Sequence, residues 1–280
     1  MRKGLGAPGR RASLSLAAGL VIMAASVEPA IAEGERADAA PPTSDVGANA
    51  IDEATTPLPI KTQIGFKPSY TFPNGDDRYK AELLFEPVLP YQGLLVPALE
   101  VPWFWSIARI QLSALSQQNG QGPASGFGDL TFTDLGARHV GPFDVGAGFA
   151  TVFPMATNPA LGQGKVQFGP AVGVRLPGDP LNVAVLVQNF YSVAGSSQSP
   201  DVAYVTVQPF VTIHLPSDFF VTSDAPMAFY WRGKGSTVPV DLGFGRAFGE
   251  HFVGSAQFWD TLADSGHGNI KIRVVWNFQP

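Results

Sequence analysis

The sequence predicts an all-β fold, namely a transmembrane, up-and-down antiparallel β-barrel of about twelve strands. Short runs in which large apolar residues alternate with small or polar ones recur from Lys61 onward. Only 15% of the 280 residues are charged, whereas glycine and proline contribute 31 and 25 residues. A segment typical of a cleavable secretion signal precedes these runs, so the mature chain is expected to leave the cytoplasm.

Residues 1–32 have the three parts of a secretory signal peptide. The segment MRKGLGAPGRR is basic, LSLAAGLVIMAAS is mostly apolar, and Ala30-Ile31-Ala32 forms an A-x-A cleavage site. The apolar run is shorter than the roughly 18 residues that a membrane-spanning helix needs. We therefore expect cleavage near Ala32 and export toward the outer membrane of a Gram-negative bacterium. The sequence contains no cysteine, so packing and hydrogen bonds must stabilise the mature protein.

Residues 33–60, EGERADAAPPTSDVGANAIDEATTPLPI, differ in composition from the rest of the chain. They are rich in alanine, proline and acidic residues and show no apolar period. We expect a disordered or extended acidic segment, followed by the barrel in residues 61–280. A plug inside the barrel or a periplasmic docking arm is the alternative for this segment.

Twelve strands are expected in this second part. They cover residues 62–70, 80–90, 94–110, 127–138, 143–154, 165–176, 181–193, 202–215, 218–230, 236–248, 251–260 and 269–278. Tight turns at 141–143, 177–180, 216–218 and 249–250 alternate with longer loops at 116–126, 156–164, 194–200, 231–235 and 263–268, as in outer-membrane barrels. Residues 94–110 contain Pro97 and Pro102, which favour a strand over a helix.

Residues 143–154, FDVGAGFATVFP, show the alternation most clearly. Phenylalanines dominate one face and glycine and alanine the other, with the period of two that a strand requires. The same division recurs in residues 165–176, 236–248 and 269–278, where charges lie on the face opposite the apolar row. A soluble sandwich is the alternative, but its wet face normally carries many lysines, glutamates and threonines. We therefore expect the apolar face to contact lipid and the small face to line a lumen.

Polar residues that alternate with an apolar row are expected to line this lumen. They are Glu82, Glu86, Glu100, Gln167, Arg175, Gln188, Gln208, Asp241, Gln257, Lys271 and Arg273. Opposing charges across a lumen select solutes. The alternative is that these residues pair with one another and fill a narrow barrel.

The sequence carries no recognisable catalytic, metal or cofactor motif. Its four histidines lack a spacing suited to a metal, and no G-x-S-x-G turn occurs. We expect no enzyme and no cofactor, although His214 or His251 could form a hydrolase site with Ser255. The formal net charge is −5 and no basic patch occurs, so a nucleic-acid partner is not expected.

Two segments resemble the outer-membrane transporter family of the putative MetA pathway of phenol degradation. They are GFGDLTFTDLGAR at 126–138 and, after Trp231, STVPVDLGFGRAFG at 236–249. The resemblance implies a barrel of about twelve strands and the uptake or export of small, often hydrophobic or aromatic compounds. One departure is the end of the chain, where Phe278 is followed by Gln279 and Pro280. The barrel-assembly machinery usually reads an aromatic residue at the last position.

These observations together favour a passive outer-membrane channel or transporter for a small-molecule solute. A non-transporting structural or adhesive barrel and a barrel enzyme acting on lipid are the alternatives. The expected partners are outer-membrane lipid, the barrel-assembly machinery and the solute. The substrate, the gating and the oligomeric state are left open by the sequence.

Overall fold

The structure, a computed structural model, describes residues 45–73, 79–92, 105–119, 122–232, 235–263 and 269–280. It contains one α-helix, α1 (Asp45–Thr55), and two short 3₁₀ helices, η2 (Pro159–Leu161) and η3 (Pro216–Asp218). The strands are β1 (Gln63–Pro73), β2 (Tyr79–Gln92), β3 (Trp105–Asn119), β4 (Gly122–Val140), β5 (Phe143–Phe153), β6 (Lys165–Leu176), β7 (Leu181–Gly195), β8 (Ala203–Leu215), β9 (Phe219–Ser223), β10 (Met227–Arg232), β11 (Ser236–Ala247), β12 (Phe252–Ala263) and β13 (Asn269–Phe278).

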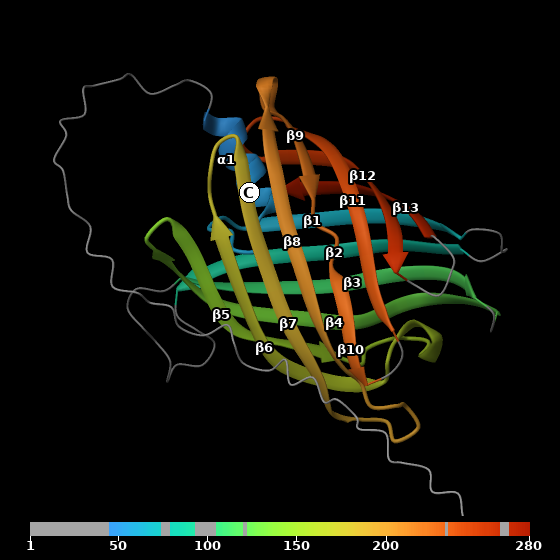
Figure 1. Ribbon diagram of the computed structural model, residues 1–280. Helices are drawn as coiled ribbons and strands as arrows, with labels where there is room; N and C mark the ends of the chain where they lie inside the picture. Colours follow the sequence, from blue (N-terminus) through green and yellow to red (C-terminus); the bar gives the residue numbers. More distant parts are fainter. Residues whose placement is uncertain (1–44, 74–78, 93–104, 120–121, 233–234, 264–268) are drawn as a thin grey trace, which may run out of the picture. The chain divides into compact units, whose positions relative to one another are not determined.

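These strands close into one antiparallel barrel (Figure 1). Consecutive strands pair with one another, except β9 with β10, and β1 also pairs with β13, so that the first and last strands close the barrel. β9 and β10 together occupy a single place in the wall, because both pair with β8 on one edge and with β11 on the other. The thirteen segments therefore form a twelve-stranded, up-and-down barrel, and the predicted fold class is confirmed.

The wall is interrupted between β9 and β10, at residues 224–226. A lipid-facing wall tolerates freed backbone N–H groups only where another group binds them. Here the carboxylate of Asp241 on β11 accepts hydrogen bonds from the backbone N–H groups of Asp224 and Ala225, at 3.0 and 2.9 Å. It also accepts one from the Ser223 hydroxyl at 2.8 Å. Pro226 has no N–H, so the break leaves no further donor at that position.

Side chains are distributed in the opposite sense to those of a soluble protein. Large apolar residues lie exposed on the outer face; on β11, Leu242 and Phe244 are 65% and 54% exposed. Many of the buried side chains are polar or charged, among them Gln167, Arg175 and Arg273. The predicted division into a lipid face and a lumen face is observed in residues 165–176, and in 236–248 it holds except at Arg246, which is exposed on the apolar face over the Phe219 ring. An apolar exterior around a polar interior is the arrangement that a bilayer requires.

Residues 116–126 were expected to be a long loop, and that expectation is wrong. β3 continues to Asn119 and β4 begins at Gly122, with Ser116 paired to Ser125 and Gln117 paired to Ala124. This part of the hairpin is polar on both faces, so it carries no apolar alternation from which a strand could be recognised. The predicted strand 94–110 begins at Trp105 in the described residues, and 94–104 lie outside them.

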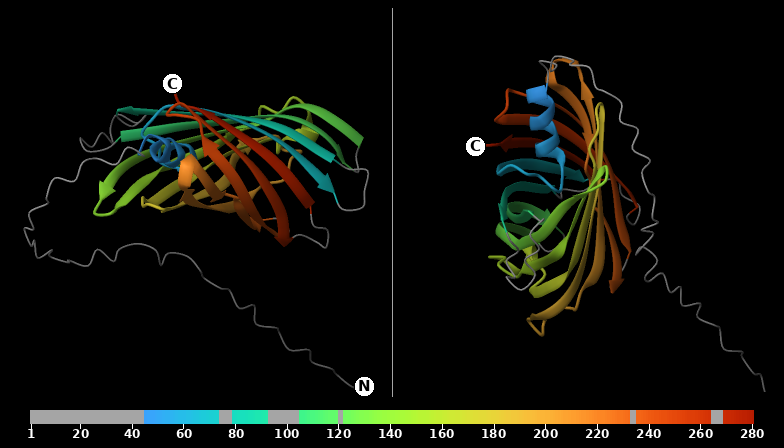
Figure 2. Two further views of the ribbon diagram at one scale, coloured as in Figure 1. Left: turned by 90° about the horizontal axis from the view of Figure 1, so that it is seen from above. Right: turned by 90° about the vertical axis from the view of Figure 1, so that its left-hand side faces the viewer.

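The expectation of disorder across residues 33–60 is also wrong where the structure describes them. α1 and the residues after it lie inside one end of the barrel (Figure 2). Ala50 and Ile51 pack on Phe220, in a cluster that also includes residues of β11 and β12. Leu58 is buried against Gly146 and Gly173, where an added Cβ would lie 2.7 and 3.2 Å from its methyl carbon. The plug that the sequence left as an alternative is the observed arrangement, and glycines of the lumen face make room for it.

No helix among the described residues is both long enough and apolar enough to cross a membrane. α1 has eleven residues, and it contacts the barrel wall at β8, β11 and β12 and the turn at η3.

The two ends of the barrel differ in the length of their connections. The short-turn end carries the turns at 141–142, 177–180, 216–218 and 248–251, and α1 lies there. The long-loop end carries the loops at 154–164 and 196–202.

Candidate functional site: the barrel lumen

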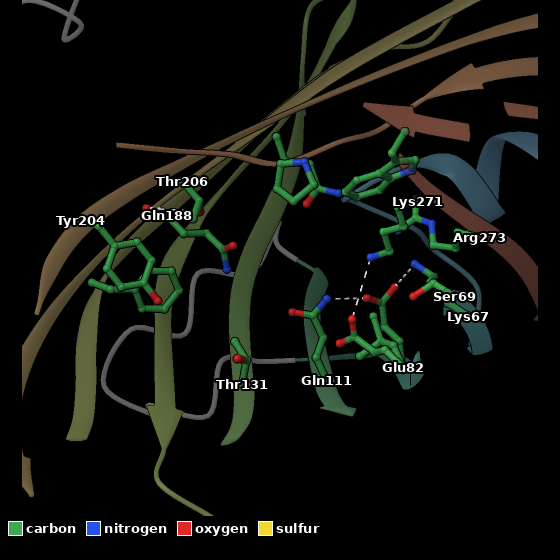
Figure 3. A pocket seen from close by; sticks show the side chains of 16 residues that line it. Lys67, Ser69, Glu82, Gln111, Thr131, Gln188, Tyr204, Thr206, Lys271 and Arg273 are labelled. Carbon is green, nitrogen blue, oxygen red and sulfur yellow. Dashed lines mark hydrogen bonds and ion pairs between the residues drawn. The ribbon is translucent and has the colours of Figure 1, made fainter. Parts of the chain in front are cut away.

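A cavity of about 300 Å³ occupies the middle of the lumen (Figure 3). β1, β2, β12 and β13 form one wall, and β7 and β8 form the opposite wall. Six of the residues predicted to line the lumen line this cavity, namely Glu82, Glu86, Gln188, Gln208, Lys271 and Arg273. The volume is at the lower end of that of small-molecule sites.

Charged residues from β1, β2 and β13 form a ladder on the first wall. The Lys67 ammonium donates to Glu86 at 2.7 Å, and the Gln111 amide donates to the other oxygen of that carboxylate at 2.5 Å. Glu82 accepts a hydrogen bond from the Ser113 hydroxyl at 2.6 Å, and Lys271 lies 3.8 Å from it. The acids of the cavity are therefore engaged by donors from neighbouring strands.

Arg273 connects this ladder to the interruption of the wall. Its guanidinium pairs with the Asp224 carboxylate and donates to the Gln257 side chain. The ring of Trp259 lies under two cations, 4.5 Å from the Arg273 guanidinium carbon and 4.6 Å from the Lys271 nitrogen. A cation over an indole ring is an attractive pair, and it fixes the direction of both side chains.

The opposite wall is aromatic and uncharged. Phe190 on β7 and Tyr204 on β8 stack with ring centroids 5.0 Å apart. Tyr204 in turn lies 5.3 Å from Tyr230 of β10, and because Tyr204 is paired with both residues, the three rings form a row across β7, β8 and β10. Figure 3 shows Tyr204 and Gln188 across the cavity from Lys271 and Glu82. The lumen thus presents an uncharged wall with stacked rings on one side and the charged residues on the other.

At the short-turn end the lumen narrows sharply. A second cavity, between α1 and the first, measures only about 30 Å³ and is lined by Thr56, Gln63 and Arg109 among others. That space is enough for one or two water molecules. α1 therefore closes the lumen to any larger solute in the described conformation.

Asp52 holds α1 to three strands. Its carboxylate accepts hydrogen bonds from Arg175 at 2.9 Å and from Asn182 at 2.7 Å, and His214 Nε2 lies 2.9 Å from it. Arg175, predicted to face the lumen, does so, but its guanidinium is occupied by the plug. We call this set of four residues the Asp52 cluster.

Glu53 organises the segment that follows α1. Its carboxylate accepts hydrogen bonds from the backbone N–H groups of Ile60 and Lys61, at 2.8 and 2.9 Å. Burial raises the pKa of Glu53 above its ordinary value, and these two hydrogen bonds offset part of the shift. Asn277 at the end of β13 and Gln279 just after it hold the helix backbone, since they donate to Ala54 O at 2.9 Å and to Ala50 O at 2.8 Å.

The loop 154–164 folds against β4 at the long-loop end. The carboxylate of Asp129 accepts hydrogen bonds from the backbone N–H groups of Ala156 and Gln163, at 3.2 and 2.7 Å. The Gln163 side chain accepts from Gln167 at 2.6 Å. Gln167, predicted to line the lumen, is thus an anchor for this loop.

The remaining predicted lumen residues have separate positions. Gln257 lines the narrow part of the lumen, and Asp241 binds the interruption of the wall. Glu100 lies outside the described residues. The residues that sequence reasoning missed include Lys67, which follows the alternation of β1 and could have been found from it. Asp224 could not, because the break around it has no period.

The catalytic alternative has no support in the hydrogen bonding. His214 contacts Asp52 and Asp179, and His251 Nδ1 donates to the Gln279 carbonyl oxygen at 2.8 Å. Among the residues that the structure describes, neither histidine is hydrogen-bonded to Ser255. Within the same residues, no group of three or more potential ligands is placed to hold a metal.

Solved structures with a similar fold are outer-membrane proteins. A crystal structure of an outer membrane channel from Pseudomonas putida matches with a TM-score of 0.57 and 14% identity, over 80% of this chain and 98% of that one. The KdgM porin has a TM-score of 0.45 and 9% identity, over 76% and 98% of the two chains. Outer membrane phospholipase A from Escherichia coli has a TM-score of 0.49 and 13% identity, over 84% and 97%. No family model and no curated protein sequence matches the chain. At such identities the likeness concerns the fold alone.

Proposed function

We propose that the chain is an outer-membrane channel through which small molecules cross passively. The observation that carries the proposal is a polar cavity of about 300 Å³ inside a wall whose outer face is apolar. A barrel that served only as a structural element would have no need of an unfilled polar interior at the depth of the hydrocarbon. Only a space of about 30 Å³ separates the cavity from α1 in the described conformation, so passage through the short-turn end requires a rearrangement of the plug.

We further propose that the solutes include small hydrophobic or aromatic compounds. The row formed by Phe190, Tyr204 and Tyr230 supports this, because rings on adjacent strands offer a planar solute an aromatic surface beside the cavity. The resemblance of residues 126–138 and 236–249 to transporters of phenol-degradation pathways points to the same class. The cavity determines which compounds of this class bind.

Flux through a locked and a released plug tests the channel function. The Cβ position of Gly47 on α1 lies 3.0 Å from the Cβ of Asp218 in the turn η3. A disulfide needs a Cβ separation of about 3.5–4.5 Å, so a shift of less than about one ångström suffices in the double variant G47C/D218C. The native chain has no cysteine that could compete.

We expect proteoliposomes with the wild type to admit phenol and other single-ring solutes faster than empty liposomes. The oxidised double variant should lose this flux, and a reductant should restore it. Each single-cysteine variant is the matched control and should conduct with or without the reductant. Equal flux into empty and protein-containing vesicles, for all small solutes, would count against a channel and favour a structural barrel. Hydrolysis of the vesicle lipid that is lost in H214A or H251A would favour the enzyme.

A further inference from the structure

We propose that the lumen cavity is a binding site for small aromatic carboxylates, with the ring on Phe190 and Tyr204 and the carboxylate on Lys271. This inference rests on the proposed channel function and names the solute class that the channel selects. It rests on the hydrogen-bond partners of the cations that line the cavity, and on the placement of the charged residues and of the stacked Phe190 and Tyr204 rings on opposite walls.

The cations that line the cavity differ in their partners. Lys67 donates to Glu86 at 2.7 Å, and Arg273 donates to Gln257 and pairs with Asp224. Lys271 has no hydrogen-bond acceptor among the described residues, and its ion pair with Glu82 is longer than the ion pairs of Lys67 and Arg273. Its nearest carboxylate oxygen, on Glu82, is 3.8 Å away, which is beyond hydrogen-bond distance.

Other donors already hold the Glu82 carboxylate. Glu82 accepts from Ser113 at 2.6 Å and lies 3.2 Å from Lys80. The other close contact of Lys271 is the face of the Trp259 ring, which accepts no conventional hydrogen bond. Among the cavity-lining cations of the described chain, Lys271 is therefore the one whose ammonium lacks a hydrogen-bond acceptor.

An ammonium in this position calls for an anionic ligand. The Lys271 side chain is only 21% exposed, so water reaches it poorly, and all three of its N–H bonds are donors. A carboxylate in the cavity would supply charge-assisted hydrogen bonds, which are roughly twice as strong as neutral ones. A ligand with only hydroxyl or amide groups would satisfy the donors without balancing the charge.

The opposite wall favours a planar aromatic ring in the ligand. No residue that lines the cavity from β7 or β8 is charged, and Phe190 and Tyr204 present a stacked pair of rings there. A planar ring gains offset stacking on such a pair beyond the burial of its area. With about 300 Å³ available, the cavity accommodates a single-ring compound with its acid group directed across the lumen.

Calorimetric titration of the full mature chain in detergent tests the site with three probes. Benzoate carries both features, benzamide lacks the charge, and cyclohexanecarboxylate lacks the planar ring. We expect saturable binding of benzoate, with benzamide roughly ten- to a hundredfold weaker, as follows from the loss of hydrogen bonds to a charged group. Cyclohexanecarboxylate should bind severalfold more weakly than benzoate.

Two substitutions of lysines on the same wall separate the site from general charge effects. K271Q should weaken benzoate by about ten- to a hundredfold and leave benzamide nearly unchanged. K80Q is the matched control, because Lys80 also contacts Glu82 but is 44% exposed and does not line the cavity. It should bind benzoate as the wild type does. K271R, which keeps the charge, should retain most of the affinity, and this shows that a loss in K271Q is not a loss of folding.

Equal affinity for benzoate and benzamide, or an unchanged affinity in K271Q, would overturn the proposal, as would the absence of saturable benzoate binding to the wild type. These outcomes are independent of flux. Benzoate binding without transport into proteoliposomes would keep the site and reject the channel. Transport without benzoate binding would keep the channel and reject the site.

Discussion

Asp224 is the first residue of the break in the described wall, and the carboxylate of Asp241 on β11 accepts the backbone N–H of Asp224 with both oxygens at 3.0 Å. The side chain of Asp224 points the other way, into the lumen, where it pairs with Arg273. One acid therefore replaces the missing strand pairing, and the other contributes a negative charge to the lumen beside Arg273.

Removing the Asp241 carboxylate should destabilise the barrel. D241A leaves the N–H groups of Asp224 and Ala225 without an acceptor, and each such loss costs about 1–3 kcal/mol when the group is buried. We expect D241A to lower the free energy of unfolding by roughly 2–5 kcal/mol on the same scale. Denaturant unfolding of the detergent-solubilised protein measures this. E250A in the exposed turn before β12 is the control, and equal stabilities of the two variants would contradict the role given to Asp241.

Neutralising Asp224 should alter ion selectivity. In D224N the Arg273 guanidinium keeps its place beside Gln257 and Trp259 but loses its ion-pair partner, so the lumen becomes more positive. Fixed charge in a low-dielectric lumen concentrates the opposite ion. The reversal potential of open channels in a salt gradient should shift toward anion selectivity. D260N changes an acid that is not among the cavity-lining residues and should leave the potential unchanged.

Loosening the Asp52 cluster should release the plug. D52N keeps the shape of the side chain but removes the negative charge that Arg175 and His214 face. Hydrogen bonds to charged groups contribute about 1.5–3 kcal/mol each, so the closed state should lose on the order of 2 kcal/mol or more. More frequent channel openings in a planar bilayer would report this. V46S alters an exposed residue of the same helix and should behave as the wild type. Unchanged opening in D52N would mean that α1 is held by other contacts.

The plug should be held less firmly as pH rises through the raised pKa of Glu53. This pKa is above the ordinary value of 4.5, mainly because of burial, so the docked helix binds the proton more tightly than the released one. The stabilisation of the docked plug by this raised pKa is complete below about pH 4.5, and it declines as pH rises through the higher pKa of the docked state. The wild type should thus open more often, relative to E53Q, at pH 7 than at pH 4. Opening frequencies recorded for both proteins across this range test the sign, and a parallel response of both would refute it.

The lipid-facing assignment of β11 is open to a direct test. Leu242 is 65% exposed on the outer face, and an arginine at the bilayer midplane of a barrel costs about 2–4 kcal/mol. L242R should therefore reduce the free energy of unfolding in liposomes by up to that amount. E250R, in the turn outside the membrane, should have little effect. A soluble sandwich would tolerate both changes equally.

The sequence by itself determined which face each strand presents. An alternation of two, as in residues 165–176, is a local property that survives whatever the strand packs against. It predicted correctly that Gln167, Arg175 and Arg273 point inward and that Phe168 and Leu242 point outward. The number of strands followed from the same signal, including residues 218–230, which form one place in the wall despite their interruption.

Only the tertiary structure decided how the inward groups combine. Asp52 precedes Arg175 by 123 residues, and Gln279 reaches Ala50 across 229, so no spacing in the sequence could pair them. A period of two gives the side of a wall on which a residue lies, but its partner across the lumen depends on strand order and stagger. The docking of an acidic, alanine-rich segment as a buried plug also depends on the tertiary structure. Its few apolar residues can be buried only inside a lumen whose glycines leave room for them.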